Sequence, residues 1–520
     1  MSESTLQTAA GPEPDFAEPL PPRRAQNLAL LRRHPWIIGG ACLVLFSFLL
    51  LRWAGTRPGY DPYGWLTWGY QTLHLNLDLG GAPSWKPLTW LFDVPFSLFG
   101  HVSLWLWMTT AVAAALAGAI FAGRLVWKLC ALLGVGRRPA LVAAAFSGAC
   151  LLGIENYMHY VLSVQSDPMI ATMCLAAIDC HLSDRPRWAM ALAVLASLGR
   201  PEAWPFLGLY AIWAWRRVPS MRWLVVAGLA LIPLLWFGVP TITNGRPLVA
   251  GQLALASPRE LHGNKVLGTI HRFTALHLLP VELLALVAIG IAWLRRNRLL
   301  LILAGGAVVW VIVEIAFVLH GWPGVPRYLF EPAAITAVLA GVSVGWILHE
   351  GPLLLLARRG LPAWATRRRL PAWGAAILVG LIVISLIPGA IARLRTEHKD
   401  LYHERFRTKT INRLQATVDA VGGSRRVRDC GRPVITVEFV SILAWMTDLN
   451  DGILGHRPAI ELRQHHGSVL FTALHSGWSV RAVHLRGQRI AKCSTLKGSF
   501  LFTSHHPSGI LTRYIQGPLF

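Results

Sequence analysis

The sequence predicts a mainly α-helical, polytopic membrane protein: a bundle of about eleven transmembrane helices with a small extracytoplasmic α/β domain at the C-terminus. First, the 520 residues are 54% hydrophobic and only 14% charged, with a mean hydropathy of +0.47. A soluble protein carries about 25% charged residues. Second, the apolar residues form runs of about 18 to 22, long enough to cross the hydrocarbon core as helix. Third, the composition becomes mixed after residue 393.

The N-terminal segment, residues 1–35, is rich in proline and polar residues and is predicted to be a disordered cytoplasmic tail. It lacks the features of a signal peptide, because the first apolar run starts late and is long. The transmembrane domain is predicted over residues 36–392. Its candidate spans are residues 36–53, 102–123, 139–154, 168–181, 188–199, 203–215, 222–239, 278–294, 299–319, 329–348 and 371–391.

The connections between these spans divide by charge. If the spans alternate, the basic connections all lie on the N-terminal side of the membrane. Their basic residues are Arg124, Lys128, Arg137, Arg138, Arg185, Arg187, Arg216, Arg217, Arg222, Arg295, Arg296, Arg298, Arg358, Arg359, Arg367, Arg368 and Arg369. Short basic loops stay in the cytoplasm, so we expect a cell-membrane protein with a cytoplasmic amino terminus and an extracytoplasmic carboxyl terminus. The net charge of +23 then reflects this bias and anionic lipids. No nucleic-acid motif is present, so we expect no nucleic-acid partner.

The connections on the other side of the membrane carry most of the unusual polar residues. The largest is a first extracytoplasmic loop over residues 54–101, rich in Trp and Tyr. The others are residues 155–167, 199–204, 240–277 and 320–332. Loops that only join helices have no reason to concentrate acids, aromatic residues and single arginines on one side. This asymmetry predicts a functional site at the extracytoplasmic surface.

The tail, residues 393–520, is predicted to form the extracytoplasmic α/β domain. Helical periodicity runs from 397 to 421 and stops at Gly422-Gly423. PVITVEF, SVLFTAL, SVRAVHL and GSFLFTS have strand patterns, and VSILAWMTDL has a helical one. Cys430 and Cys493 are the two cysteines of this tail, in what we expect to be an oxidising space, and are predicted to form a disulfide. No metal-ligand spacing exists, so we expect no metal and no cofactor.

Asp61 and Lys86 are the first candidate site residues, and both lie in the first loop. Asp61, in Tyr60-Asp61-Pro62, is either a helix cap or a general base held at the membrane surface. Lys86 lies between Trp85 and Pro87. It is either a snorkelling lysine in an interfacial aromatic belt or an anchor for a lipid phosphate.

The motifs of this loop resemble the GT-C superfamily of integral-membrane glycosyltransferases, in particular the branch of protein O-mannosyltransferases and aminoarabinose lipid A transferases. That branch has an acid soon after the first span, followed by a Lys-Pro-(Pro)-Leu-x-x-Trp element. Here the element is Lys86-Pro87-Leu88-Thr89-Trp90, with one proline instead of two. The further matches are Pro326-Arg327-Tyr328-Leu329 with Pro332, and Gln165-Ser166-Asp167-Pro168.

The resemblance implies transfer of a sugar from a polyprenyl-phosphate donor to a glycan, lipid or protein acceptor, without a metal and usually with inversion. Asp61 would remove the acceptor proton. Lys86, Arg327 and Arg200 would stabilise the negative charge that develops on the departing lipid phosphate. Membrane lipids are expected partners. A lipid phosphate is a leaving group of low pKa, so no separate general acid is essential to protonate it.

Several other polar residues are candidates with open alternatives. Asp167 and Glu155 place the acceptor or assist Asp61, or they cap helices. Arg200 and Glu202 bind substrate or form a structural ion pair. Arg327 and Tyr328 contact phosphate or anchor the interface, and Glu331 would pair with Arg327.

Two other functions compete with glycosyl transfer. One is a transporter or flippase for lipid-linked sugars, which would place ionisable residues and broken helices at the bilayer midplane. The charges of this chain instead cluster at one surface. The other is a non-catalytic envelope assembly protein whose tail binds partners.

Overall fold

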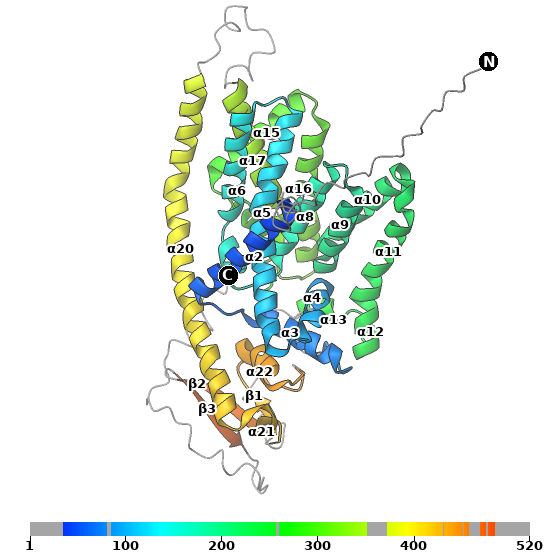
Figure 1. The fold of residues 1–520 in the computed structure, drawn as a ribbon, viewed down its shortest axis with the longest axis vertical. Coiled ribbons are helices and arrows are strands. Elements are labelled where there is room, and N and C mark those ends of the chain that lie inside the picture. Colours follow the sequence, from blue (N-terminus) through cyan, green and yellow to red (C-terminus); the bar gives the residue numbers. More distant parts are fainter. Residues whose placement is uncertain are drawn as a thin grey trace, which may run out of the picture.

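The structure is a computed structural model, and it describes residues 35–80, 85–255, 259–350, 372–429, 431–450, 452–456, 468–474 and 477–483. The predicted disulfide between Cys430 and Cys493 and the predicted strand GSFLFTS lie outside these residues. The fold is mainly helical, as predicted (Figure 1).

Each of the eleven predicted spans falls on a helix. These helices are α2 (Pro35–Ala54), α5 (Ser103–Leu132), α6 (Arg137–Leu152), α8 (Asp167–His181), α9 (Pro186–Gly199), α10 (Trp204–Arg217), α11 (Arg222–Pro233), α15 (Leu279–Leu294), α16 (Arg298–Leu319), α17 (Phe330–Glu350) and α20 (Ala372–Ala420). Short elements connect them: η1 (Gly100–Val102), α7 (Tyr157–Leu162), η2 (Pro201–Ala203), η3 (Pro219–Met221), the π-helical η4 (Leu234–Gly238), α12 (Val239–Asn244), α13 (Val249–Leu255), α14 (Lys265–Thr274) and η5 (Pro326–Leu329).

The structure does not confirm the prediction of eleven membrane spans. Within the described residues, six helices are long and apolar enough to cross a membrane, or seven if α14 and α15, bent by 97°, count as one span. The predicted spans on α6, α8, α9 and α10 correspond to helices of only 14 to 16 residues. Such helices are shorter than the roughly 20 residues that a full crossing requires.

Helix α17 is the centre of the bundle. In its candidate span, 83% of the most apolar stretch is buried, against 11% for α20. Small residues allow this close packing: a Cβ atom at Gly341 would lie 2.8 Å from Ser147 Cβ, and one at Gly345 would lie 2.7 Å from Cys130 Sγ. Close approach at small residues is typical of helices that associate in a membrane. The second half of α17 is thereby held closely against α5 and α6.

The first loop folds into two helices, α3 (Tyr60–Leu73) and α4 (Pro87–Ser97), which lie between the bundle and the tail (Figure 1). Trp85 holds them together: its ring lies 5.2 Å from that of Trp68 and 5.8 Å from that of Trp90. Its Nε1 donates to the backbone oxygen of Leu235, 2.9 Å away. The aromatic residues of the loop are therefore largely core, and they fix the position of the neighbouring Lys86.

The tail begins inside helix α20, which runs without interruption past residue 393, where the sequence predicts the domain boundary. Beyond it come α21 (Gly423–Asp429), β1 (Arg432–Val434), η6 (Val437–Phe439), α22 (Val440–Thr447), β2 (Ser468–Leu474) and β3 (Gly477–Val483). The described strands form one sheet in the order β1-β2-β3, with β1 and β2 parallel and β2 and β3 antiparallel. Helix α22 packs against α3 through the rings of Tyr63 and Trp445, 5.4 Å apart.

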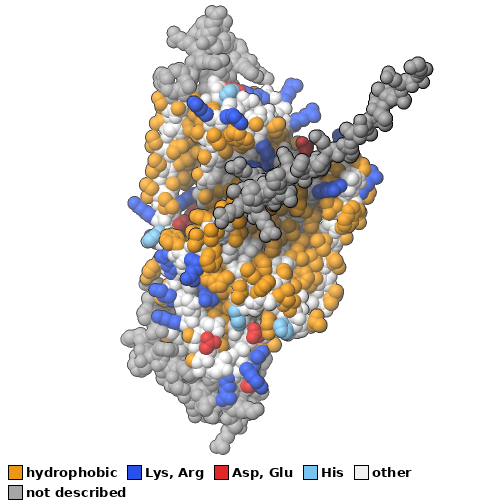
Figure 2. Space-filling model, viewed as in Figure 1, with side chains coloured by type: hydrophobic (Ala, Val, Ile, Leu, Met, Phe, Trp, Pro, Cys, Tyr) orange, Lys and Arg blue, Asp and Glu red, His pale blue; other side chains and the backbone are white. Residues whose placement is uncertain are grey.

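Apolar side chains cover the middle of the molecule, and Lys and Arg gather above and below them (Figure 2). Large apolar residues that are exposed include Leu45, Trp223, Ile302 and Leu381, on α2, α11, α16 and α20. A soluble monomer rarely exposes such a continuous apolar surface. The distribution therefore supports a membrane protein.

Candidate functional site

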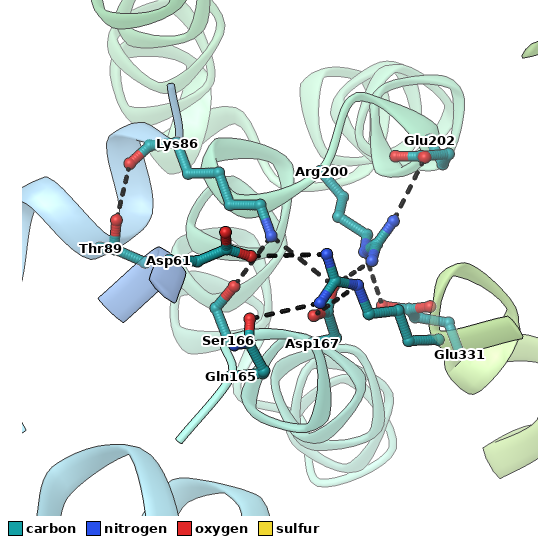
Figure 3. Close-up of polar contacts among 10 residues, drawn as sticks. Asp61, Lys86, Thr89, Gln165, Ser166, Asp167, Arg200, Glu202 and Glu331 are labelled. Carbon is teal, nitrogen blue, oxygen red and sulfur yellow. Dashed lines mark hydrogen bonds and ion pairs between the residues drawn. The ribbon is translucent and has the colours of Figure 1, made fainter. Parts of the chain in front are cut away.

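Charged side chains from four distant segments meet where α3 and α4 contact the bundle (Figure 3). They come from the first loop, the start of α8, the turn after α9 and the start of α17. The predicted site residues that lie together are Asp61, Lys86, Asp167, Arg200, Glu202, Arg327 and Tyr328. We call this set, together with Glu331, the polar cluster.

Asp167 is the hub of the polar cluster. Its side chain is fully buried and forms an ion pair with Arg200. Lys86 Nζ lies 3.6 Å from Oδ1 of the same carboxylate, and Arg327 Nε lies 3.6 Å from Oδ2. A carboxylate without exposure is costly unless it is paired. Lys86, Arg200 and Arg327 neutralise the Asp167 carboxylate, and this carboxylate in turn holds the three cations together.

Arg327 connects Asp167 to Asp61. Its Nη2 lies 3.5 Å from Asp61 Oδ2, and its Nη1 donates to Gln165 Oε1 at 3.4 Å. The guanidinium lies over the ring of Tyr160, 5.5 Å from its centroid. The planar fork of an arginine can serve two carboxylates at once. Arg327 therefore fixes the position of Asp61 relative to the buried hub.

Lys86 occupies the N-cap position of α4 and reaches into the polar cluster. Its Nζ donates to Ser166 Oγ at 3.1 Å and lies over the ring of Trp65, 5.4 Å from its centroid. Burial lowers the pKa of Lys86, and the negative charge of Asp167 opposes this effect. Lys86 is thus a cation held inside the protein and does not snorkel to the surface.

Arg200 lies on the far side of the hub. Its Nη1 is 3.4 Å from Glu202 Oε1 and its Nε is 3.8 Å from Glu331 Oε1. Its guanidinium stacks over Tyr328, 4.0 Å from the ring centroid. Glu331, which the sequence suggested would pair with Arg327, pairs with Arg200, because the turn of η5 directs Arg327 towards Asp61.

The backbone around Asp61 bears on its alternative role as a helix cap. The N-cap residue of α3 is Gly59, and Asp61 lies in the first turn with 25% of its side chain exposed. Its carboxylate faces Arg327. A negative charge in the first turn is favourable for the helix dipole, but the contacts place Asp61 in the polar cluster.

Glu155 lies elsewhere. Its Oε2 is 2.7 Å from Arg393 Nε on α20, and Arg393 also donates to backbone oxygens of Ala275 and Leu276. These contacts anchor α20 to the bundle. The prediction that Glu155 binds substrate receives no support from its contacts, because its ion-pair partner is Arg393 and not a residue of the polar cluster.

Sequence reasoning missed Gln165 and Ser166 as contributing side chains, although both belong to the motif around Asp167. It also missed Glu314, an acid in the apolar helix α16 that is 1% exposed. A lone carboxylate in a long apolar run was the available signal, since such residues are costly in a membrane and usually functional or paired.

No known protein family matches the chain, and no curated protein matches it. Among solved structures it is similar to the crystal structure of ArnT from Cupriavidus metallidurans bound to undecaprenyl phosphate. The identity is 13%, the TM-score is 0.43, and the match covers 84% of this chain and 93% of that chain.

Proposed function

We propose that the protein is a membrane glycosyltransferase that moves a sugar from a polyprenyl-phosphate donor to an extracytoplasmic acceptor. One observation carries this proposal: a partly exposed carboxylate, Asp61, lies beside Arg327 and close to a second cation, Lys86. Both cations are held by the buried Asp167. A base next to preorganised positive charge suits the transfer of a glycosyl group from a phosphate to a hydroxyl.

The positive charge serves the donor. As the bond between the sugar and the phosphate breaks, negative charge develops on the phosphate oxygens. Lys86 supplies a compact ammonium and Arg327 a planar fork that matches phosphate geometry. Arg327 Nε is buried and faces Asp167 Oδ2, so the guanidinium is held at the hub while its Nη atoms lie towards Asp61 and Gln165. Arg200 is enclosed by three carboxylates and serves mainly to hold them.

Asp61 serves the acceptor. It is 25% exposed, whereas Asp167 is fully buried, so a hydroxyl can reach only the former. The Asp61 carboxylate would take the acceptor proton as the oxygen attacks the anomeric carbon. Asp167, predicted as catalytic from the sequence, acts in this proposal as a positioning residue for the three cations. Direct attack by the hydroxyl would invert the anomeric configuration.

The proposed orientation follows the charge of the loops. The basic connections would stay in the cytoplasm, which puts the polar cluster, α3 and the tail on the extracytoplasmic side. A donor with a long polyprenyl chain could then enter from the bilayer, beside the apolar surface, with its phosphate at the level of Lys86.

The test is turnover of lipid-linked sugars by the full chain in nanodiscs. The substrates are polyprenyl-phosphate sugars in an envelope lipid extract, and mass spectrometry measures the polyprenyl phosphate released. Asp61→Asn should lower turnover by about 10² to 10⁴-fold, the usual contribution of a general base, and leave binding of undecaprenyl phosphate intact. Asp184→Asn, an exposed aspartate at the other end of α8, is the control.

Two outcomes would contradict the proposal. Wild-type turnover by Asp61→Asn would remove Asp61 from the mechanism. Movement of lipid-linked sugar across proteoliposomes without release of polyprenyl phosphate would identify a transporter.

A further inference from the structure

A cavity of about 250 Å³ lies between α3 and the tail, apart from the polar cluster. Helix α3 contributes Thr67 and Tyr70, the segment around η1 contributes His101, and α22 with its C-cap contributes Trp445 and Asp448. Binding sites form preferentially where two parts of a protein meet. Nothing in the proposed chemistry uses this cavity.

Helix α3 separates the cavity from the polar cluster. Asp61 and Trp65, four residues apart, share the helix face that meets Arg327 and Lys86. Tyr63, Thr67 and Tyr70 share another face, on which Tyr63 packs against Trp445. At about 1.5 Å per residue, Tyr70 lies about 13 Å from Asp61 along the helix axis. The two sites are therefore distinct but share one rigid wall.

The lining combines an aromatic surface with a few polar groups. The Trp445 ring is held by Tyr63 at 5.4 Å and by His101 at 4.7 Å, each edge to face. Asp448 is fixed by its backbone, which has φ 52° at the C-cap of α22. Burial raises the pKa of Asp448, and the nearby His101 and Arg428 oppose that effect. The carboxylate accepts hydrogen bonds, and the Tyr70 hydroxyl both donates and accepts.

We propose that this cavity binds one saccharide unit of the acceptor. The role as an acceptor subsite rests on the proposed function, whereas saccharide binding itself does not. A sugar ring offers hydroxyl groups to a carboxylate and a phenol, and an apolar C–H face to an aromatic ring such as that of Trp445.

Size and charge favour a saccharide over other ligands. Drug-sized sites measure about 300 to 1,000 Å³, so about 250 Å³ suits a single sugar ring. A phosphate or carboxylate ligand would meet the Asp448 carboxylate, and an acyl chain would bring no hydrogen-bonding group to Tyr70 and Asp448. A saccharide held here would fix one end of an acceptor glycan while another of its hydroxyls reaches Asp61.

The test measures binding of four methyl glycosides to the full chain in nanodiscs by saturation-transfer NMR. The probes are the methyl glycosides of glucose, mannose, galactose and arabinose, and glycerol is the polyol control. At least one glycoside should bind saturably to the wild type. Asp448→Asn and Tyr70→Phe should each weaken it by at least tenfold. Asn tolerates the positive φ of position 448, so the first variant keeps the backbone. Asp419→Asn, at an exposed aspartate on α20, is the matched control and should bind as the wild type does.

The inference is overturned if no glycoside binds better than glycerol, or if both cavity variants bind as the wild type does. Thermal unfolding of each variant shows that a loss of binding is not a loss of fold. The variant Asp61→Asn distinguishes a failure of the saccharide site from a failure of the proposed function, because it should retain glycoside binding. If that variant also keeps full transfer activity, the proposed mechanism fails while the saccharide site remains.

Discussion

Asp167 and Asp179 lie near opposite ends of helix α8, and each is a buried carboxylate held by several cations. Asp179 Oδ1 is 2.6 Å from Lys128 Nζ, and its Oδ2 is 3.1 Å from Arg124 Nη2. Asp167 gathers Lys86, Arg200 and Arg327 in the same way. The described part of the chain thus contains two similar buried clusters, one at each end of a single helix. This arrangement provides an internal control for the role of charge in the proposed site.

Asp167→Asn should destabilise the protein and weaken donor binding together. Removing one partner of a buried ion pair costs about 3–5 kcal/mol, because the remaining cations lose their counter-charge. Thermal unfolding and binding of undecaprenyl phosphate to the variant in nanodiscs measure both effects. Asp179→Asn should lower stability and leave donor affinity unchanged. Equal losses of donor affinity in the two variants would show that the effect is only structural.

Donor binding should weaken at alkaline pH through Lys86. Burial lowers the pKa of this side chain, so its charge is lost below the ordinary lysine value of about 10.4. The stability effect has the opposite sign: burying the cation costs stability below the folded pKa, and this cost is relieved as the pH rises from the folded pKa to the ordinary value. The pH profile of KM for the donor measures the first effect.

Lys86→Arg provides the check on that assignment. A guanidinium stays charged throughout this range, so the alkaline rise in KM should disappear, although the affinity itself changes because the two side chains differ in shape. If KM for the donor still rises at alkaline pH in this variant, a group other than Lys86 causes the rise.

Arg327→Lys should lower kcat by about 10²-fold or more, the usual effect of losing one preorganised donor. The reason is geometric: Arg327 lies within 3.6 Å of both Asp61 and Asp167, and one ammonium cannot reproduce that fork. Single-turnover release of polyprenyl phosphate measures the step. Arg405→Lys, which changes an arginine on α20 that donates to backbone oxygens of α2, should leave kcat unchanged. A kcat near wild type for Arg327→Lys would make this residue a general anion binder only.

The orientation of the chain is open to a direct test. A reporter active only outside the cytoplasm, fused to the carboxyl terminus, should be active, because the basic connections are expected inside. The same reporter inserted in the basic connection after Gly134, between α5 and α6, should be inactive. The reverse pattern would place the polar cluster on the cytoplasmic face and remove the extracytoplasmic acceptor.

Hydrophobic patterning predicted the position of the helices in the membrane part but not their length. An apolar segment has the same pattern whether its helix crosses the bilayer or is a short helix packed among others. Helices α8 and α9, of 15 and 14 residues, are of the short kind. The segment that forms α3 and α4 was predicted only as a loop, in which the helix-cap alternative for Asp61 was the one indication of a helix. Their aromatic residues are spaced for packing around Trp85, which depends on contacts that no local pattern reveals.

The candidate site was predictable to the extent that its residues belong to motifs. Asp61, Lys86, Asp167 and Arg327 lie in short distinctive segments, and the topology places those segments at one end of the bundle. The pairing within the cluster was not predictable, as Glu331 and Glu155 show, because it depends on the direction of each side chain at a helix end. The Asp448 cavity left no local signal, since its lining comes from three separate segments.

In the proposed orientation, the length of helix α20 determines how far from the bilayer the tail is held. Its 49 residues extend about 74 Å at about 1.5 Å per residue, more than twice the roughly 30 Å of a hydrocarbon core. The tail is therefore carried on the continuation of a membrane helix and not on a pliable tether. Under the proposed function and orientation, the height of the tail above the bilayer would be set by the length of that helix, so an acceptor rooted far from the membrane would have to bend down to a fixed level to be modified.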